Sequence, residues 1–554
     1  MATIVSTSHQ PRRPRPDRRR TPRSKPKLRI ALFADGPTQP RWMVDALAKI
    51  ARSDFAELVL IAVSPREKAP LPFLWRVYRR IDGWIFGPQE NLSEPTDLRL
   101  AMPTIRYQVI PPPAKGNVGT GWHEAASTDP HLDVAFVLGE LDDAEFENIA
   151  KFGIWRYCFG PKHGTREDLA GWREVAQGDA VTTSGLRVHL WPGVNRLLYQ
   201  SHSRTYPLSV LKNRANLLPK MALFAERELR MLRILGGTQL KHRALLPVAE
   251  SIGAEKPPKT AEILGALIRI GGRVARRALQ KLLTIDQWFI AFRFGAPNWD
   301  GDLAKFIRLQ PPKDRIWADP FPLYRDGRYF IFFEEVLFAT GKGHIAMIEV
   351  DRSGGHTEPI KVLECSYHLS YPFLIEQDGD LFMVPESGEN RSIDLYRCIQ
   401  FPDVWRLEKT LLKDVACADA TFHRADNRWW MFVNIGAKGT ELYDELHLFH
   451  ADNLLGEWLP HVHNPVKSDV FGARPAGRLF MHEGVLHRPA QICAPLYGSG
   501  IVISKILQLT PRHYQEEEVA RLLPSLKQGT LGIHTLNCSG ELNVIDGFNR
   551  RSRI

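Results

Sequence analysis

The segment ADPFPLYRDGRYFIFFEE at residues 318–335 decides the fold of this 554-residue chain. In it, a polar residue opens a strand, a turn follows, and a second strand runs through apolar and aromatic side chains. The same pattern returns as SYPFLIEQDGDLFMVPES (370–387), ADATFHRADNRWWMFVN (418–434), ARPAGRLFMHEGVLHRPAQ (473–491) and IHTLNCSGELNVIDGF (533–548). A repeat of roughly fifty residues, with hairpin turns and no helical spacing, is typical of propeller blades. We therefore predict an all-β five-bladed propeller over residues 295–550.

A chemically distinctive residue opens the first strand of each repeat. The five are Asp319, Tyr371, Asp419, Arg474 and His534. The innermost strand of each propeller blade lines the central axis, so we expect these five side chains on one ring at its mouth. The second strands add three acids near the same funnel, namely Glu334, Glu335 and Glu386.

Carboxylates that converge on a cavity suit sugar chemistry. Glycoside cleavage needs one carboxylate as base or nucleophile and a second, protonated, as acid, roughly 5 to 9.5 Å apart. The pattern predicts Asp319 as base or nucleophile, with Glu386 and Glu335 as candidate acids. The remaining ring residues are expected to bind substrate: Tyr371, Asp419, Arg474 and His534. Structural roles are the alternative, since Asp319 before Pro320 suits a strand cap and Glu335 suits an ion pair with an arginine of the next blade.

Two family resemblances support this interpretation. The motif Asp319-Pro320-Phe321 resembles the five-bladed arabinanase and fructosidase group of glycoside hydrolases, which implies that Asp319 is the base or nucleophile. The segments ADPF, FFEE, HLSYPFLIEQDGDLFMVPES, ARPAGRLF and HRPAQ resemble the N-terminal domain of plant glucosamine inositolphosphorylceramide transferases. The second resemblance implies a glycan or glycolipid substrate. Tyr371-Pro372 stands where the hydrolases have Asp-Pro, so their set of three acids is incomplete here.

Residues 28–217 are expected to form a separate α/β domain. The strand LRIALFAD (28–35), a helical RWMVDALAKIARS and the strand AELVLIAVS give the order that opens a parallel sheet. The segments LDVAFVLG, GIWRYCFGPKHG and GWREVAQGDAVTTSGLRVHL resemble the folate-dependent formyltransferase family. That family carries an Asn-x-His pair where this chain has Trp155, Arg156 and Tyr157. We therefore predict a degenerate formyltransferase-like domain.

Residues 218–294 are expected to form a helical linker. In TAEILGALIRIGGRVARRALQKLL (260–283), apolar residues recur at three- or four-residue steps, with four arginines and one lysine among them. A basic amphipathic helix of this kind lies on an acidic membrane surface or packs its apolar face on a neighbouring domain. Both interpretations stay open.

The net charge of +11 is concentrated at the N-terminus. Residues 1–27 hold nine Arg or Lys against Asp17 alone, and this Pro-rich stretch is predicted to be a disordered basic tail. We therefore expect no specific nucleic-acid partner. The tail lacks the apolar core of a secretion signal, which predicts a cytoplasmic protein, with peripheral contact at the inner membrane surface as an alternative.

No cofactor or metal is expected from the motifs. A phosphate loop, an HExxH helix, a GxSxG elbow and a four-ligand zinc spacing are all missing from the sequence. The leading functional prediction is a carbohydrate-active protein that binds a glycan or glycolipid head group in the propeller funnel and processes it by glycosyl transfer or hydrolysis. A non-catalytic glycan-binding scaffold and a sugar N-formyltransferase are the alternatives.

Overall fold

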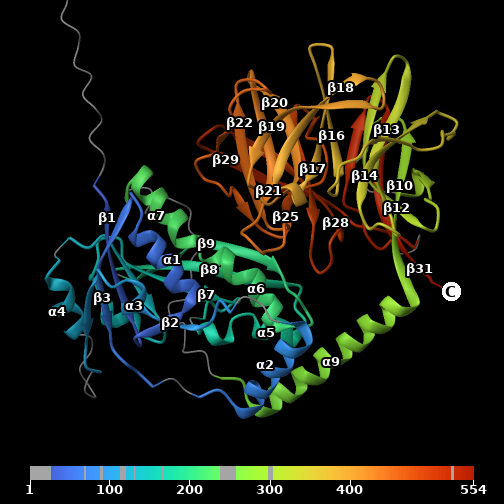
Figure 1. The fold of residues 1–554 in the computed structure, drawn as a ribbon. Coiled ribbons are helices and arrows are strands. Elements are labelled where there is room, and N and C mark those ends of the chain that lie inside the picture. The colour runs from blue at the N-terminus through green and yellow to red at the C-terminus, as the bar shows by residue number, and fades with distance from the viewer. Residues whose placement is uncertain are drawn as a thin grey trace, which may run out of the picture.

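The computed structural model describes residues 26–67, 70–87, 91–112, 120–129, 131–164, 166–191, 193–237, 257–296, 303–525 and 529–553. Two bodies make up this part of the chain, an N-terminal α/β domain and a C-terminal β-propeller, and the long helix α9 (Thr260–Leu283) runs between them (Figure 1). Most of the predicted basic tail lies outside the described residues.

A seven-stranded mixed sheet forms the centre of the N-terminal domain. Its strand order is β5-β3-β1-β6-β7-β8-β9, parallel from β5 to β7 and antiparallel for the last two strands. The strands are β1 (Leu28–Ala34), β3 (Ala56–Val63), β5 (Arg106–Val109), β6 (Val134–Leu138), β7 (Ile154–Phe159), β8 (Val181–Leu190) and β9 (Val194–Arg204). Every residue of β6 and β7 is buried, as expected for central strands of a sheet covered on both faces. The α/β prediction is confirmed.

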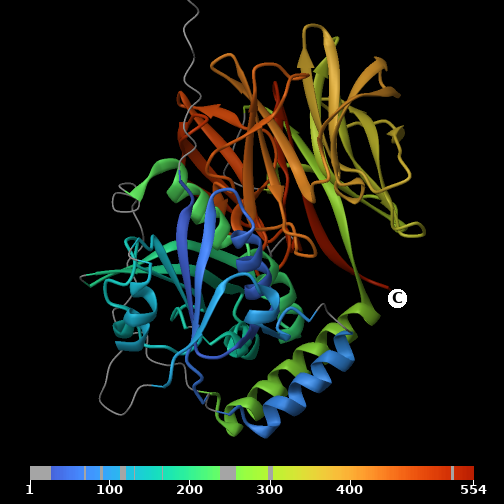
Figure 2. The same ribbon diagram turned by 60° about the vertical axis from the view of Figure 1, so that its left-hand side comes forward.

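Helices and short elements surround this sheet. The α-helices are α1 (Arg41–Ala51), α2 (Phe73–Phe86), α3 (Leu98–Ala101), α4 (Thr120–Ser127), α5 (Trp172–Gln177), α6 (Val210–Met221) and α7 (Phe224–Leu235). Two 3-10 helices, η1 (Asp143–Phe146) and η2 (Glu167–Leu169), and the paired strands β2 (Thr38–Pro40) and β4 (Pro95–Asp97) complete the domain. Helix α2 projects from the domain beside α9 (Figure 2).

The C-terminal domain is a five-bladed propeller, as predicted. Blade 1 is β12 (Arg315–Arg325), β13 (Arg328–Leu337), β14 (Gly343–Val350) and β15 (Ile360–Leu363); blade 2 is β16 (Ser370–Gln377), β17 (Asp380–Ser387), β18 (Ser392–Gln400) and β19 (Val404–Lys413). Blade 3 is β20 (Cys417–Ala425), β21 (Arg428–Ile435), β22 (Glu445–Ala451) and β23 (Leu459–Pro460), with β24 (Lys467–Ser468) at its edge. Blade 4 is β25 (Phe471–Pro475), β27 (Val485–Ile492), β28 (Gly500–Leu509) and β29 (Tyr514–Leu522), with β26 (Phe480–His482) beside β27. The 3-10 helices η3 (Leu303–Lys305) and η4 (Gly388–Asn390) lie in loops.

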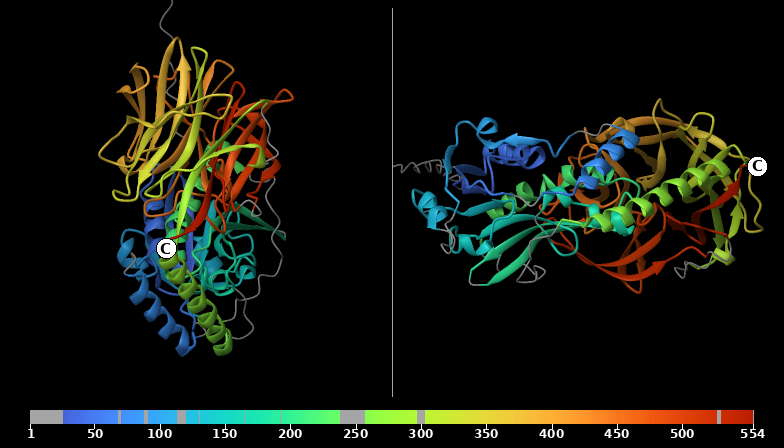
Figure 3. Two further views of the ribbon diagram at one scale, coloured as in Figure 1. Left: turned by 90° about the vertical axis from the view of Figure 1, so that its right-hand side faces the viewer. Right: turned by 90° about the horizontal axis from the view of Figure 1, so that it is seen from below.

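The fifth blade closes the ring with strands from both ends of the domain. It consists of β30 (Leu536–Ser539), β31 (Leu542–Ser552), β10 (Thr284–Phe294) and β11 (Ile307–Leu309). Strand β10 pairs with β31 over its full length, from Thr284 opposite Ser552 to Phe294 opposite Leu542. The C-terminal end of the chain therefore lies where α9 passes into β10 (Figure 3). The propeller thus begins at Thr284, inside the interval expected to be a helical linker, because the last blade needs an outer strand.

The same backbone bulge opens the innermost strand of blades 1, 2 and 3. Asp319, Tyr371 and Asp419 have φ values of 51°, 44° and 54°, and the strand pairing shifts register at each of them. This left-handed conformation is tolerated by Asp but costly for a Tyr. Local backbone strain of about 1 to 3 kcal/mol per residue persists only where the surrounding structure fixes it, and such positions cluster at functional sites.

The N-terminal domain contacts the propeller at the end where these innermost strands begin. Cys417, which opens β20, pairs with Ile435 at the end of β21, so the loop 436–444 emerges beside it. That loop and the start of β22 carry three acids that bind the N-terminal domain. The pairs are Arg204–Glu441, Lys220–Asp444 at 2.6 Å and Arg227–Glu445 at 2.6 Å. The ring of strand-opening residues therefore faces the boundary between the domains.

Candidate active site

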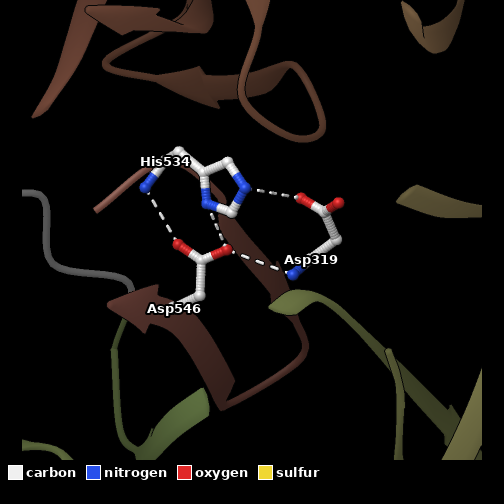
Figure 4. A group of neighbouring side chains, drawn as sticks. All are labelled: Asp319, His534 and Asp546. Carbon is white, nitrogen blue, oxygen red and sulfur yellow. Dashed lines mark hydrogen bonds and ion pairs between the residues drawn. The ribbon is translucent and has the colours of Figure 1, made fainter. Parts of the chain in front are cut away.

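A buried triad lies at the closure of blades 1 and 5. The Nδ1 atom of His534 is 2.6 Å from Oδ2 of Asp546, and its Nε2 atom is 3.5 Å from Oδ1 of Asp319 (Figure 4). Asp319 also accepts a hydrogen bond of 2.6 Å from the hydroxyl of Thr535. The three residues are at most 3% exposed. Burial therefore strengthens each of these electrostatic interactions.

The triad divides its charge unequally. Burial alone lowers the pKa of His534, but the neighbouring carboxylates of Asp546 and Asp319 outweigh it and raise that pKa to about 9. Burial raises the pKa of Asp319 to about 7; His534 opposes the shift, and Asp419 and Glu334 add to it. The shortest contact is between His534 and Asp546, so we assign the ion pair to those two residues. Asp319 is then a carboxyl group that gains and loses a proton near neutral pH.

The triad also has the spacing of a metal site, since one ligand atom from each residue lies within 4.8 Å of the others. The carboxylate of Asp546 is already saturated, however. Its Oδ2 accepts the backbone N–H of Asp319 at 3.1 Å, and its Oδ1 accepts those of His534 and Thr535, both at 2.9 Å. A hydrogen-bonded triad therefore accounts for these contacts without a metal ligand set.

A second acidic cluster lies around Arg474. Its Nε atom donates to Asp419 at 2.6 Å and its Nη2 atom donates to Glu386 at 3.3 Å, while Nη1 donates to the carbonyl oxygen of Leu442 at 3.1 Å. Asp419 also accepts a 2.7 Å hydrogen bond from Gln491. These internal partners occupy the guanidinium that was expected to bind substrate. Arg474 instead fixes two carboxylates beside each other.

Glu386 is the accessible acid of this cluster. Its side chain is 17% exposed, against 1% for Asp419. Burial, with the charge of Asp419 added to it, raises the pKa of Glu386 well above its ordinary value, although Arg474 acts in the opposite direction. Glu386 and Asp419 share one arginine, so a proton on Glu386 relieves the repulsion between them. The arrangement places a partly exposed carboxyl group of raised pKa beside a more deeply buried acid.

Glu335 lies apart from both clusters. Its Oε1 accepts from Trp317 at 2.8 Å and from Arg315 at 3.2 Å, and its Oε2 is 3.1 Å from His344. Burial opposes ionisation, but these three partners together lower the pKa of Glu335 to about 2. An acid held ionised in this way has no proton to donate. The structure therefore brings Asp319, Glu386 and Asp419 together and separates Glu335 from them; its neighbour Glu334, 2.8 Å from His368, faces the site instead.

Tyr371 of blade 2 contacts three other blades in the interior. It is fully buried, and its hydroxyl is 2.7 Å from the Thr421 hydroxyl and accepts the Gly477 N–H at 2.7 Å. Its ring packs edge-on against Phe321, with 4.8 Å between centroids. Both its hydroxyl and its ring are thus occupied by protein groups. Tyr371 therefore has a structural role in the interior of the propeller.

Several residues of the site were not predicted from the sequence. Asp546, Gln491 and Asn434 are all on second strands, at or near the positions that Glu334 and Glu386 occupy in blades 1 and 2. The sequence spacing could have identified this position. Glu334, Glu386 and Asn434 each follow the strand-opening residue of their blade by the same number of residues. Each of the three pairs with the residue that directly precedes that strand-opening residue. Asn434 is fully buried, and neither polar atom of its side chain has a hydrogen-bond partner among the described residues.

Two tyrosines connect the site to the N-terminal domain. The guanidinium of Arg474 lies over the rings of Tyr497 and Tyr443, at 4.9 Å and 5.7 Å from their centroids. Arg204 of β9 also lies over the ring of Tyr443, at 4.6 Å from its centroid. Ala180 and Val181 of the same domain pack on the apolar cluster that contains both tyrosines. The N-terminal domain therefore forms one wall of the mouth.

The comparisons with known proteins concern the propeller. Residues 310–537 match the family model described as Glucosamine inositolphosphorylceramide transferase 1, N-terminal, as the sequence resemblance predicted. Glucosamine inositolphosphorylceramide transferase 1 of Oryza sativa subsp. japonica is 35% identical over 216 residues, which are 38% of this chain and 29% of that protein. The same-named protein of Arabidopsis thaliana is 33% identical over 215 residues, 38% of this chain and 28% of its own length. The chain thus spans less than a third of the length of these curated relatives.

Solved structures with a similar chain path include carbohydrate hydrolases at low similarity. Zg3597, a family 117 glycoside hydrolase produced by Zobellia galactanivorans, is 12% identical, with a TM-score of 0.32 over 48% of this chain and 91% of that one. The exo-beta-1,3-galactanase 1,3Gal43A of Clostridium thermocellum is 9% identical, with a TM-score of 0.32 over 42% and 59%.

The family match lies outside residues 28–217, so the formyltransferase-like character of the N-terminal domain stays a prediction. Trp155, Arg156 and Tyr157, where that family has its Asn-x-His pair, are all buried in β7. Arg156 is held by Asp143 at 2.7 Å and by the carbonyl oxygen of Gly139 at 3.1 Å. These three residues contribute to the core of the domain.

Proposed function

We propose that the propeller mouth binds a glycan or glycolipid head group and processes it by glycosyl transfer or hydrolysis. Glu386 acts as the general acid and Asp319 as the base or nucleophile. Burial and the charge of Asp419 favour the protonated form of Glu386, Arg474 positions both carboxyl groups, and His534 with Asp546 orients Asp319. The match of residues 310–537 to the transferase family supports a substrate of this class.

One observation carries this proposal: acids outnumber their cationic partners in a buried site. Asp319, Asp419 and Glu386 are influenced by one another's charge, and Arg474 is the arginine that Asp419 and Glu386 share. Buried carboxylates that repel one another cannot all ionise near neutral pH. When the environment gives two neighbouring carboxyl groups different pKa values, one can act as an acid and the other as a base. Glycosyl chemistry needs such a pair.

A non-catalytic glycan-binding scaffold is the second candidate, and the burial of Asp319 favours it. Asp319 is only 3% exposed, and the N-terminal domain lies against one side of the mouth. A substrate must therefore displace or rearrange side chains to bring a sugar to Asp319. Binding without turnover fits the same surface.

Replacing Asp319 with Asn separates the two candidates. Asn keeps the size of the side chain, tolerates the left-handed backbone and still accepts from Thr535, so we expect the fold and glycan binding to survive. Turnover should fall by about 10²-fold or more, since a base or nucleophile is removed. Asp326→Asn is the matched control, because Asp326 has the same φ of 51° in the exposed turn of the same hairpin.

The assay measures turnover and binding of glycans and inositol-phosphate glycolipid head groups by the full chain. Turnover lost in Asp319→Asn with binding intact supports catalysis. Glycan binding by the wild type with no turnover of any head group assigns the scaffold function instead. Absence of both activities overturns the carbohydrate proposal as a whole.

A further inference from the structure

Helices α2 and α9 form a projection with an unusual surface. They lie side by side below the rest of the molecule (Figure 2), and α9 is fixed to α5 through Arg269, which donates to the carbonyl oxygen of Ala176 at 2.9 Å. The described residues include 29 exposed large apolar side chains, and these two helices carry nine of them. The two helices make up a small fraction of the chain, so exposed apolar side chains are concentrated on them.

The exposed apolar residues form a stripe on each helix. Six of the nine are Phe73, Ile81 and Trp84 on α2 and Ile268, Leu279 and Leu282 on α9, and we call these six residues the α2–α9 surface; the other three are Ile85, Leu264 and Leu283. Trp84 is 85% exposed and Leu282 is 71% exposed. Successive members of each set are 3, 8 or 11 residues apart, close to whole turns of a helix, so each set lies toward one side of its helix. The opposite sides are buried in the protein through residues such as Trp75 and Ile263.

The two helices are also strongly basic. Their cationic residues are Arg76, Arg79, Arg80, Arg269, Arg273, Arg276, Arg277 and Lys281, against two acids. Both acids are engaged locally: Asp82 accepts the backbone N–H of Leu211 at 2.9 Å, and Glu262 accepts that of Lys259 at 2.7 Å. Arg276 and Arg277 are exposed. The projection therefore presents apolar side chains within a field of positive charge.

We infer that the α2–α9 surface docks on an anionic lipid bilayer. Exposed Trp and Leu side chains beside Arg and Lys match the boundary between lipid head groups and acyl chains, where apolar groups insert and cations meet lipid phosphates. None of the described helices is long and apolar enough to cross a membrane, so the contact lies in the plane of the interface.

The test is sedimentation of the full chain with vesicles of phosphatidylcholine, alone or mixed with phosphatidylglycerol. We expect binding to the mixed vesicles and much weaker binding to phosphatidylcholine alone. The variant Trp84→Ser, Leu279→Ser, Leu282→Ser should bind the mixed vesicles about tenfold more weakly or worse, because the inserted apolar area is removed. The control Leu407→Ser, Met481→Ser, Leu523→Ser changes equally exposed residues of the propeller and should bind as the wild type does.

Charge is tested separately by Arg276→Gln with Arg277→Gln, which should weaken binding severalfold and reduce its dependence on salt. Every variant keeps residues 1–25, so undiminished binding in the apolar variant assigns the contact to the basic tail and overturns the inference. Failure of the wild type to bind either vesicle overturns it as well.

Sedimentation velocity tests whether a second copy of the chain, and not a lipid bilayer, covers the α2–α9 surface. If the wild type is a dimer that the apolar variant converts to a monomer, a second copy of the chain covers this surface and the inference is wrong. The single variant Trp84→Ser repeats the vesicle test with the smallest disturbance of the fold. The vesicles contain no glycan, so the outcome is independent of the proposed function.

Discussion

Glu386→Gln should reduce turnover of unactivated glycans by about 10²- to 10⁴-fold, the range that general acid catalysis contributes. The amide keeps the shape of the side chain and accepts from Arg474 as the carboxyl does, but it cannot transfer a proton to a leaving oxygen. Glycan binding and thermal stability should therefore change little. Glu376→Gln, which alters an exposed glutamate on β16 of the same blade, is the control and should leave turnover unchanged.

The leaving group distinguishes acid catalysis from a structural defect. A substrate with an activated aryl leaving group departs without protonation, so Glu386→Gln should lose much less of its activity on that substrate. Equal losses on activated and unactivated substrates would show that Glu386 does not donate the proton. Rates on both substrates, measured with the same enzyme preparation, decide between the two outcomes.

Arg474→Met should lower the free energy of unfolding by about 3 to 5 kcal/mol, the cost of removing one partner from a buried ion pair. Methionine retains the apolar stem but leaves Asp419 without its arginine and Glu386 without its 3.3 Å contact. Turnover should fall with stability because Glu386 is no longer positioned. Arg424→Met, at an exposed position of β20, should change stability by less than about 0.5 kcal/mol.

The loss in Arg474→Met should depend on pH in a defined direction. Without the guanidinium, the pKa of Glu386 in the folded state rises further above its unfolded value. The folded variant then binds more protons than the unfolded chain, so its deficit shrinks as the pH falls and grows toward neutral pH. Denaturant unfolding at several pH values measures this trend. A deficit that stays constant with pH would mean that Arg474 contributes through packing and not through its charge.

The propeller and most of its ring could be predicted from the sequence because the repeat is local. Each hairpin carries its own strand pattern and its own turn, and the turn residues Asp326, Asp378 and Asp426 all adopt the left-handed conformation that such turns require. Asp319, Glu386 and Asp419 were found in this way, and the structure brings them together.

Contacts between blades could not be predicted in the same way. Asp546 meets Asp319 across the closure of the ring, more than two hundred residues apart, and Glu335 meets His344 on the next strand. Whether an acid is paired or free depends on such neighbours, which the repeat does not specify. Arg474 was expected to bind substrate for this reason, since its partners Asp419 and Glu386 belong to other blades.

The boundary of the propeller shows the same limit. Strand β10 follows directly after the helical stretch of α9, and nothing in its own sequence marks it as the outer neighbour of β31. The pairing becomes evident only when the fifth repeat is seen to lack an outer strand. Closure of the propeller depends on strands from both ends of the domain, so the periodicity of a local segment does not predict it.

The central claim is that Glu386 carries a proton at the mouth of the propeller. Titration of glutamate carboxyl carbons by NMR, with the wild type compared with Glu386→Gln to assign the signal, measures this protonation directly. We predict a titration midpoint for Glu386 well above the ordinary range of a glutamate, and a clear decrease in that midpoint in Asp419→Asn, which removes the neighbouring charge. A midpoint at or below the ordinary value would mean that Glu386 is ionised beside Arg474, and it would contradict the assignment of this site as an acid–base pair.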